Sequence, residues 1–319
     1  MKAAVLHAVG QVPQYEDFAD PTPKDGEVKL KVLAASIKNV DKMMAKGEHY
    51  AGPNQLPAVC GVDGVGELPD GKRVYFANLA HPYGAMAEYA VVNPQWAFAV
   101  PDALDSATAA ALPNPAMSSW MALQLRAKLQ AGETVLVLGA TGAAGRLAIQ
   151  IAKHLGAGKV VAAGRGQALD ELKGLGADEV VDTEQADEAA IAQFQQYGPY
   201  HVVLDYLWGH PAEVLLQSLT GHSLTSEPVT TRYIQIGESA GSTVALAAEA
   251  LRSSGVELYG SGGGSVSREE MFKAVMAAMH ELMDLASSGE LQLPTEQVPL
   301  KDVEAAWVRT DGKRLVLIP

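Results

Sequence analysis

The chain has 319 residues, of which 48% are hydrophobic and 19% are charged, so an intrinsically disordered protein is excluded and two domains are favoured over one. Its formal net charge of -13 argues against a nucleic-acid partner, because no basic stripe offsets the acidity. No apolar run approaches the roughly 18 residues that a membrane span requires, so no membrane partner is expected.

The first hundred residues read as mostly β-structure with irregular loops. The N-terminal apolar stretch is too short for a signal peptide and is typical of a first strand. Residues 28–32 alternate with period two, as a half-buried strand does, and residues 71–76 and 87–92 look similar. Cys60 is the only cysteine, which excludes an internal disulfide and CxxC zinc pairs. A cytoplasmic protein is therefore expected.

The pattern changes near Asp105. An alanine-rich segment (106–112) precedes two prolines, and a helix is predicted over residues 118–129. After Gly132, short apolar or β-rich runs alternate with helical segments; these runs are residues 134–138, 160–163, 179–181, 202–204, 233–236 and 256–259. Continuous apolar strands separated by helices predict a doubly wound α/β fold, a parallel sheet covered on both faces.

Beyond a helix that ends near Ser288, three short runs are read as strands, at 291–293, 296–298 and 314–318. They do not easily extend the parallel sheet, and we expect them to return to the N-terminal domain. The predicted organisation is a substrate domain from residues 1–112 and 289–319, with a dinucleotide-binding domain over 113–288.

The most informative stretch is a glycine-spaced turn between a buried strand and a helix. Its G-x-x-G-x-x-G spacing lets the first glycine turn tightly, the second approach a pyrophosphate, and the third pack the helix on the strand. The helix N-terminus then offers free N–H groups to phosphates. The predicted cofactor-binding residues of this turn are Gly139, Ala140, Thr141, Gly142, Ala143, Ala144 and Gly145.

The end of the second strand favours NADPH over NADH. NAD sites usually carry an acidic residue about 20 residues beyond the turn. Here Gly164 and Arg165 follow the strand, with no carboxylate at that place. An arginine can pair with a 2′-phosphate through two hydrogen bonds. A solvated surface arginine is the alternative.

The whole chain resembles the medium-chain dehydrogenase/reductases, and within them the zinc-independent quinone oxidoreductase group. The order and spacing of its fragments carry the resemblance: residues 61–66, 71–74, 84–91, 156–157, 176–182, 201–205 and 312–319. It implies a Rossmann domain joined to a GroES-like, mostly-β substrate domain, with the active cleft between them. It also implies a possible homodimer.

The resemblance also bears on zinc. Zinc members place a cysteine near the position of residues 38–41 and a His-Glu pair after the glycine matched by Gly61. Here residues 38–41 contain no cysteine, and Val62 and Asp63 stand in place of the pair, so no metal is predicted. A substitute set of His49, Cys60 and Asp63 is conceivable, although Cys60 is better explained as a small buried residue.

Further site residues follow from the same resemblance. A family segment on the substrate side matches Asp41, with Lys38 at the usual Asn position and Asn39 as a weaker polar contact. Tyr50 falls one residue late and is the candidate donor of a hydrogen bond or proton, with a packing role as the alternative. Ser118 occupies the place of a residue that faces the nicotinamide.

Three more residues complete the predicted cofactor site. The glycine-rich segment around Gly262 is placed near the nicotinamide by family likeness, with a flexible loop as the alternative. Asp205 ends a strand and could reach the ribose side of the cofactor, and Gly237 likewise follows a strand.

The predicted function is hydride transfer from NADPH to a quinone or an α,β-unsaturated carbonyl compound. Oxidation of an alcohol is difficult without a Lewis acid, whereas an electron-poor acceptor delocalises the incoming charge. The alternatives are an enoyl-thioester reductase and a non-catalytic NADPH-binding or sensing protein.

Overall fold

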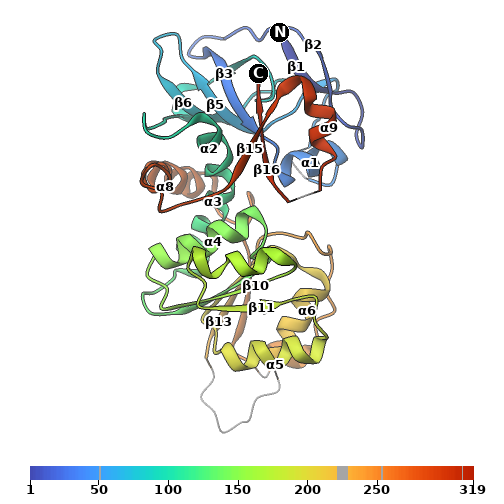
Figure 1. Ribbon diagram of the computed structural model, residues 1–319, viewed down its shortest axis with the longest axis vertical. Coiled ribbons are helices and arrows are strands. Elements are labelled where there is room, and N and C mark those ends of the chain that lie inside the picture. Colours follow the sequence, from blue (N-terminus) through green and yellow to red (C-terminus); the bar gives the residue numbers. More distant parts are fainter. Residues whose placement is uncertain (50–51, 221–228, 253, 311) are drawn as a thin grey trace. The chain divides into compact units, whose positions relative to one another are not determined.

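The computed structural model describes residues 1–49, 52–220, 229–252, 254–310 and 312–319. The chain forms two compact units. Unit 1 comprises Met1–Asn114 and Met279–Pro319, and unit 2 comprises Pro115–Ala278. The sequence interpretation placed the second division at 288/289, whereas the units divide at 278/279, inside helix α8 (Arg268–Ser288) (Figure 1).

Unit 2 is built on a six-stranded sheet in the order β11-β10-β9-β12-β13-β14, in which every neighbouring pair is parallel. The chain runs outward from β9 in one direction through β10 and β11, and then in the other direction through β12, β13 and β14. This change of direction at β9 is the doubly wound arrangement predicted from the sequence. The strands are β9 (Thr134–Leu138), β10 (Lys159–Gly164), β11 (Glu179–Asp182), β12 (Val202–Asp205), β13 (Thr231–Gln235) and β14 (Val256–Gly260).

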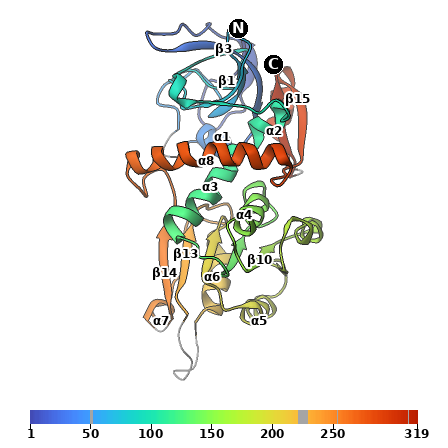
Figure 2. The same ribbon diagram turned by 90° about the vertical axis from the view of Figure 1, so that its left-hand side faces the viewer.

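Helices cover the two faces of this sheet (Figures 1 and 2). Alternate residues of β9 and β10, among them Leu136 and Val161, form one apolar cluster with Phe194 and Leu215. These last two belong to α5 (Asp187–Tyr197) and α6 (Gly209–Ser218), so both helices lie on that face. Helix α4 (Ala143–His154) packs on β9 and β10 and has a fully buried face of its own. The remaining helical segments are α7 (Ala248–Arg252), η3 (Gln167–Glu171) and η4 (Lys173–Leu175).

Unit 1 contains two sheets. A three-stranded sheet has the order β2-β1-β4, from Gln14–Asp17, Lys2–Leu6 and Ala58–Val59. A seven-stranded sheet has the order β15-β16-β3-β5-β6-β8, with β7 paired to β3. Its strands are β3 (Val28–Ser36), β5 (Asp63–Glu67), β6 (Arg73–Ala77), β7 (Tyr89–Val92), β8 (Ala97–Ala99), β15 (Thr295–Pro299) and β16 (Arg314–Ile318).

The C-terminal residues return to unit 1 as the sequence indicated. Strand β16 pairs with β3 on one side and β15 on the other. The prediction of a strand over residues 291–293 is wrong, because this segment is a loop. Its apolar character comes from packing, since Leu291 and Leu293 are both buried.

Short helices complete the chain. In unit 1 these are α1 (Asn39–Lys46), η1 (Pro94–Trp96), α2 (Ser106–Ala111), η5 (Leu300–Asp302) and α9 (Val303–Trp307). The predicted helix over 118–129 begins earlier, because α3 spans Pro113–Met121 and continues as a π-helical turn, η2 (Ala122–Ala127). Proline fits there because the first turn of a helix leaves its N–H groups unpaired.

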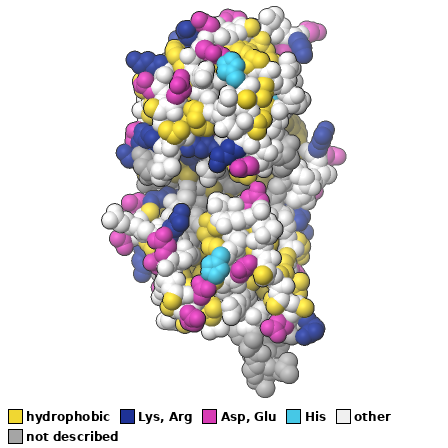
Figure 3. Space-filling model, turned by 90° about the vertical axis from the view of Figure 1, so that its right-hand side faces the viewer, with side chains coloured by type: hydrophobic (Ala, Val, Ile, Leu, Met, Phe, Trp, Pro, Cys, Tyr) yellow, Lys and Arg dark blue, Asp and Glu magenta, His cyan; other side chains and the backbone are white. Residues whose placement is uncertain are grey.

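One face of the molecule shows how its charges are spread (Figure 3). Acidic and basic side chains are interspersed on it, with apolar side chains between them. In the part of the chain that the structure describes, no helix combines the length and the apolar character needed to cross a bilayer.

Candidate functional site

The glycine turn of unit 2 joins β9 to α4 at the carboxyl edge of the sheet. Gly139 has φ +91, a backbone conformation that only glycine adopts readily. A Cβ on Gly145 would lie 2.3 Å from the Gly139 carbonyl oxygen and 2.6 Å from the Ala140 Cα. These contacts show that the helix packs against the turn more closely than any side chain permits.

The N-terminus of α4 has the features of an anion site. Its N-cap, Gly142, makes no side-chain cap, and the first turn carries no acidic residue. The first N–H groups of a helix lack partners within it, and the helix dipole adds positive potential there. Ala143 and Ala144 present only methyl groups beside these N–H groups, so the turn can accept a phosphate on its backbone.

The end of β10 lies beside this turn. A Cβ on Gly164 would lie 2.7 Å from the Thr141 side chain, so glycine lets the end of β10 lie close to the turn. The Arg165 side chain is 75% exposed, and its Nη1 lies 3.9 Å from Glu184 Oε1. Sequence reasoning missed Glu184, because this residue follows β11 and reaches Arg165 only through the pairing of β10 with β11.

Asp205 is completely buried and its carboxylate serves the fold. Oδ1 accepts hydrogen bonds from the backbone N–H groups of Leu207 (2.8 Å) and Trp208 (2.9 Å), and Oδ2 accepts one from the Tyr233 hydroxyl (2.8 Å). Burial raises the pKa of this carboxyl, although all three hydrogen bonds oppose the shift. Asp205 therefore shapes the loop after β12 from within.

Gly237 also helps to shape the loop after β12. A Cβ there would lie 2.6 Å from the Tyr206 carbonyl oxygen, so glycine lets the segment after β13 approach the loop after β12. Gly262, by contrast, has open space where a Cβ would be. Its loop is closed by Ser265, whose hydroxyl donates to the Gly262 carbonyl at 2.8 Å.

Two serines and a half-buried tyrosine lie together in unit 2. The Ser118 hydroxyl donates to the Pro115 carbonyl at 2.8 Å, and the Ser119 and Tyr206 hydroxyls are 2.8 Å apart. Burial raises the pKa of Tyr206 to about 12, and hydrogen bonds to Ser119 and Ser118 oppose the shift. Sequence reasoning selected Ser118 but not Tyr206, which directly follows Asp205 at the end of β12.

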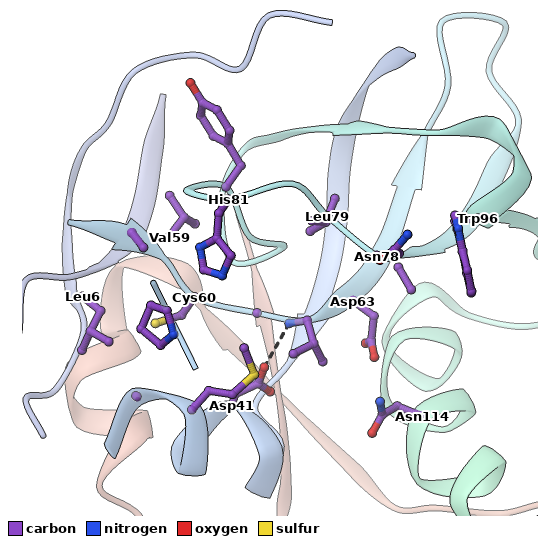
Figure 4. A pocket seen from close by; sticks show the side chains of 18 of the residues that line it. Leu6, Asp41, Val59, Cys60, Asp63, Asn78, Leu79, His81, Trp96 and Asn114 are labelled. Atoms are coloured by element: carbon purple, nitrogen blue, oxygen red, sulfur yellow. Dashed lines mark hydrogen bonds between the residues drawn. The ribbon is translucent and has the colours of Figure 1, made fainter. Parts of the chain in front are cut away.

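Unit 1 contains a cavity of about 490 Å³ within the range typical of small-molecule sites (Figure 4). Leu6, Val59 and Cys60 lie at one end of it. Asp63, Asn78, Trp96 and Asn114 lie at the other end, where most of the labelled polar side chains are found. Apolar side chains therefore predominate at the first end, where His81 also lies, and polar side chains gather at the other.

A buried ion pair stands behind the polar end. Lys38 Nζ lies 2.6 Å from Asp63 Oδ1, and the two side chains are only 3% and 2% exposed. Lys38 also donates to the Ser36 carbonyl at 3.1 Å. Asp63 Oδ1 nevertheless has no aligned hydrogen-bond donor among the described residues. The pair neutralises its charges without saturating the carboxylate.

Asp41 lines the same cavity, and each of its carboxylate oxygens accepts a hydrogen bond. Its Oδ2 accepts from the Lys38 backbone N–H at 2.8 Å and its Oδ1 from the Val62 N–H at 3.0 Å. Burial raises the pKa of Asp41, and the nearby Asp63 charge adds to this while Lys38 opposes it. Asp41 thus fixes the start of α1 to the loop before β5. Arg314, whose pKa is lowered by burial, adds a second cation near both acids.

The other predicted substrate-side residues are less central. Asn39 is exposed and does not line the cavity. Tyr50 lies outside the described residues. Cys60 lines the cavity, and burial, with a contribution from the Asp41 charge, raises the pKa of its thiol to about 12.

The place of the family's zinc ligands does not fit a zinc ion. Zinc needs three or four ligands with free lone pairs. The Lys38 ammonium has none, and it neutralises the Asp63 carboxylate. The Cys60 thiol is held protonated by burial. Among the described residues, no group of three or more His, Cys, Asp or Glu side chains is arranged to hold a metal.

The structure thus brings most predicted residues into two sets. The glycine turn, Gly164 and Arg165 gather at the carboxyl edge of the unit 2 sheet, with Asp205 and Gly237 supporting that edge from behind. Asp41 belongs to the unit 1 cavity. Besides Glu184 and Tyr206, sequence reasoning missed three residues that line the cavity, Asn78, Trp96 and Asn114, which come from separate segments and share no motif that could have linked them.

Comparison with known proteins agrees with this fold. The family model described as "Zinc-binding dehydrogenase" matches residues 143–281. The chain is 30% identical to the probable NADPH-dependent quinone reductase tdiC of Emericella nidulans, and the match covers 96% of each protein. It is 34% identical over 203 residues to the chloroplastic NADPH-dependent alkenal/one oxidoreductase of Arabidopsis thaliana, covering 57% of this chain and 52% of that protein.

A solved structure covers the chain completely. The quinone oxidoreductase from Thermus thermophilus, whose complex with NADPH is also known, superposes with a TM-score of 0.84. The two are 27% identical, and the match covers 100% of each chain.

Proposed function

Because the chain belongs to the medium-chain dehydrogenase/reductase superfamily, in its quinone oxidoreductase-like group, we propose that it reduces a quinone or an α,β-unsaturated carbonyl compound with NADPH and without zinc. The observation that carries this proposal is the glycine turn, where the N-terminus of α4 is left without a side-chain cap.

The chain's own residues would hold the cofactor in unit 2. The backbone N–H groups after Gly142 bind the pyrophosphate, and Gly145 keeps the helix close enough for them to do so. Arg165 is exposed and able to bind a 2′-phosphate, an anion that would compete with Glu184 for the guanidinium. The bound cofactor supplies a hydride.

The unit 1 cavity would hold the acceptor. Its size suits one small ring or a short chain, and its apolar end binds the hydrocarbon part. The Lys38–Asp63 pair stands where zinc members have ligands, which supports chemistry without a Lewis acid. Electron-poor acceptors suit such a site, because they delocalise the charge that the hydride brings.

The test is cofactor consumption against a panel of quinones and enones, with NADPH and NADH compared. We expect NADPH to be preferred, and Arg165→Ala to lower kcat/KM for NADPH by at least about tenfold while changing that for NADH little. Lys173→Ala, an exposed cation of the same unit, is the control. NADPH binding without turnover of any acceptor would identify a non-catalytic protein, and turnover of an enoyl thioester alone would identify a thioester reductase.

Zinc is tested separately, by metal analysis of the purified protein. Fewer than about 0.1 zinc ions per chain are expected, because the donor set at Lys38 and Asp63 does not fit the ion. One zinc per chain that resists dialysis would contradict this part of the proposal.

We also propose a homodimer that forms through the free edge of β14. Among the described strands β14 pairs only with β13 (Figure 2), and it carries the exposed Leu258. An uncovered strand edge with an apolar side chain is a template for pairing with a second copy. Sedimentation should show a dimer that Leu258→Glu dissociates; a wild-type monomer would refute it.

A further inference from the structure

The loop between β6 and β7 places a histidine at the apolar end of the unit 1 cavity (Figure 4). His81 is exposed, and it makes no hydrogen bond or ion pair with any other residue that the structure describes. Its neighbours at this end include Leu6 and Val59, whose side chains offer no polar group. A ligand in the cavity can therefore contact an imidazole that the fold leaves unused.

The backbone of this loop is held in place next to His81. The Val59 N–H of β4 donates a hydrogen bond to the Pro82 carbonyl at 2.9 Å. A Cβ on Gly84 would lie 2.3 Å from the Cys60 carbonyl oxygen, so the loop packs closely on the end of β4. The imidazole is therefore presented to the cavity from a fixed backbone, which a group that acts on a ligand requires.

The buried titratable groups that line the cavity are poor proton donors. Asp41 accepts a backbone hydrogen bond on each oxygen, and Asp63 pairs with the Lys38 ammonium, so both carboxylates are engaged. Burial raises the pKa of the Cys60 thiol to about 12 and that of the Tyr75 phenol well above its usual value. Histidine is the side chain that ordinarily exchanges a proton near neutral pH, and general acid catalysis requires such a group.

A para-quinone offers an oxygen to each end of such a cavity. Its two carbonyl groups lie on opposite sides of the ring, and both share the negative charge that a hydride brings. At the polar end Asn78 is exposed and Asn114 is half-buried, and neither amide has a hydrogen-bond partner among the described residues. An amide N–H donates to a carbonyl oxygen. One quinone oxygen can therefore bind these amides, which leaves the other for His81.

We propose that His81 is a catalytic residue whose imidazolium protonates an oxygen of a quinone bound in the unit 1 cavity. This inference rests on the proposed reductase function and adds the source of the proton. The quinone receives a hydride from the bound cofactor, which makes it a hydroquinone monoanion. An N–H bond of the imidazolium breaks and an O–H bond forms on the substrate, so that neutral hydroquinone leaves. The exposed imidazole recovers its proton from water.

The first test compares the wild type with His81→Ala at saturating NADPH. The acceptor is duroquinone, a para-quinone whose ring carbons are all substituted, so that added imidazole does not attack it. We expect kcat to fall at least about 100-fold while KM changes little, because a positioned general acid contributes about 10²–10⁴ to a rate. Free imidazole should then raise kcat of the variant at least about tenfold, since a small acid can enter the vacated, exposed place.

A second variant, His81→Gln, separates proton transfer from hydrogen bonding. A glutamine amide donates a hydrogen bond but has no proton to give up near neutral pH, so its kcat should fall about as far as that of His81→Ala. The control is His7→Ala, which removes an exposed histidine of the same unit that pairs with Glu16 outside the cavity. It should keep the wild-type kcat and show no response to imidazole. Thermal unfolding checks that each variant is folded.

The outcomes separate this inference from the function on which it rests. A folded His81→Ala variant with the wild-type kcat would overturn the role of His81, and so would a loss of kcat that imidazole does not restore. A His81→Gln variant as active as the wild type would make the residue a hydrogen-bond donor only and would overturn it as well. A wild-type protein that reduces no quinone or enone would instead contradict the proposed function.

Discussion

The glycine turn of unit 2 and the cavity of unit 1 offer a ligand different kinds of contact. The turn offers backbone: a Cβ on Gly145 would lie 2.3 Å from the Gly139 carbonyl oxygen, and the N-terminus of α4 has no side-chain cap. The cavity uses side chains, with Asp63 and Asn114 drawn from segments far apart in the chain. A backbone site tolerates little change in spacing, whereas a side-chain site can change its ligand by single substitutions.

The largest effect is expected in the turn. Gly145→Ala places a methyl group 2.3 Å from the Gly139 carbonyl oxygen, so the helix must move away and the phosphate site is lost. Overpacking of this kind costs about 1–3 kcal/mol of stability. NADPH titration followed by fluorescence should show an affinity at least about tenfold lower.

Gly174→Ala is the matched control, because a Cβ there meets no atom within 4 Å. It should leave both NADPH affinity and stability as in the wild type. Normal affinity in a folded Gly145→Ala variant would remove the argument that this glycine is required.

The second prediction concerns the cavity and its buried pair. Lys38→Met strands the Asp63 carboxylate, and breaking a buried ion pair destabilises a protein by about 3–5 kcal/mol. Lys72→Met breaks an exposed pair and should have no measurable effect. Urea unfolding compares the two variants. Equal free energies of unfolding for Lys38→Met and Lys72→Met would mean that loss of the buried partner of Asp63 does not destabilise the protein.

Sequence reasoning anticipated the unit 2 sheet and the glycine turn, because both depend on local pattern. Apolar strands alternate with helices there, and the three glycines of the turn lie within seven residues. It could not anticipate the polar end of the cavity. Asn78 follows β6 and Asn114 lies in α3, so only the folded sheet of unit 1 brings them together.

Two local patterns have a meaning that only the folded chain reveals. The apolar residues 291–293 look like a strand, but Leu291 and Leu293 are buried from a loop. Asp205 ends a strand and looks available to a ligand, but Tyr233 and two backbone N–H groups occupy its carboxylate. Burial explains the apolar pattern of the loop, while contact of Asp205 with the cofactor stays a prediction.

The third prediction sharpens the contrast at the apolar end of the cavity. Burial raises the pKa of the Cys60 thiol to about 12, so at pH 8 almost no thiolate is present to react. A disulfide reagent such as Ellman's should leave the folded protein unmodified and should report one thiol per chain in denaturant. Rapid reaction in the folded state would show that the cavity opens at this end.

The smallest effect is expected at the rim of unit 1. Hydrogen bonds from Arg309 (2.7 Å) and Lys313 (2.8 Å) lower the pKa of Glu296 to about 2. A lowered carboxyl pKa contributes stability above its ordinary value near 4.5, and this contribution is lost as pH falls toward 2. Glu296→Gln should therefore lower Tm slightly at pH 6, with the difference closing near pH 2.

Glu304→Gln removes an exposed carboxylate from α9 and serves as the control for charge alone. A Tm difference between wild type and Glu296→Gln that stays constant from pH 6 to pH 2 would show that the ionised side chain is not what holds β15 in place.

The place of β16 affects how the protein is made. This strand lies between β15 and β3, yet its residues follow the whole of unit 2 in the sequence. On the ribosome, unit 2 therefore has its complete sheet while Ala35 and Ser36 of β3 still await their partners. The nascent chain carries an open strand edge throughout that interval, and chaperone binding at that stage would protect it from mispairing.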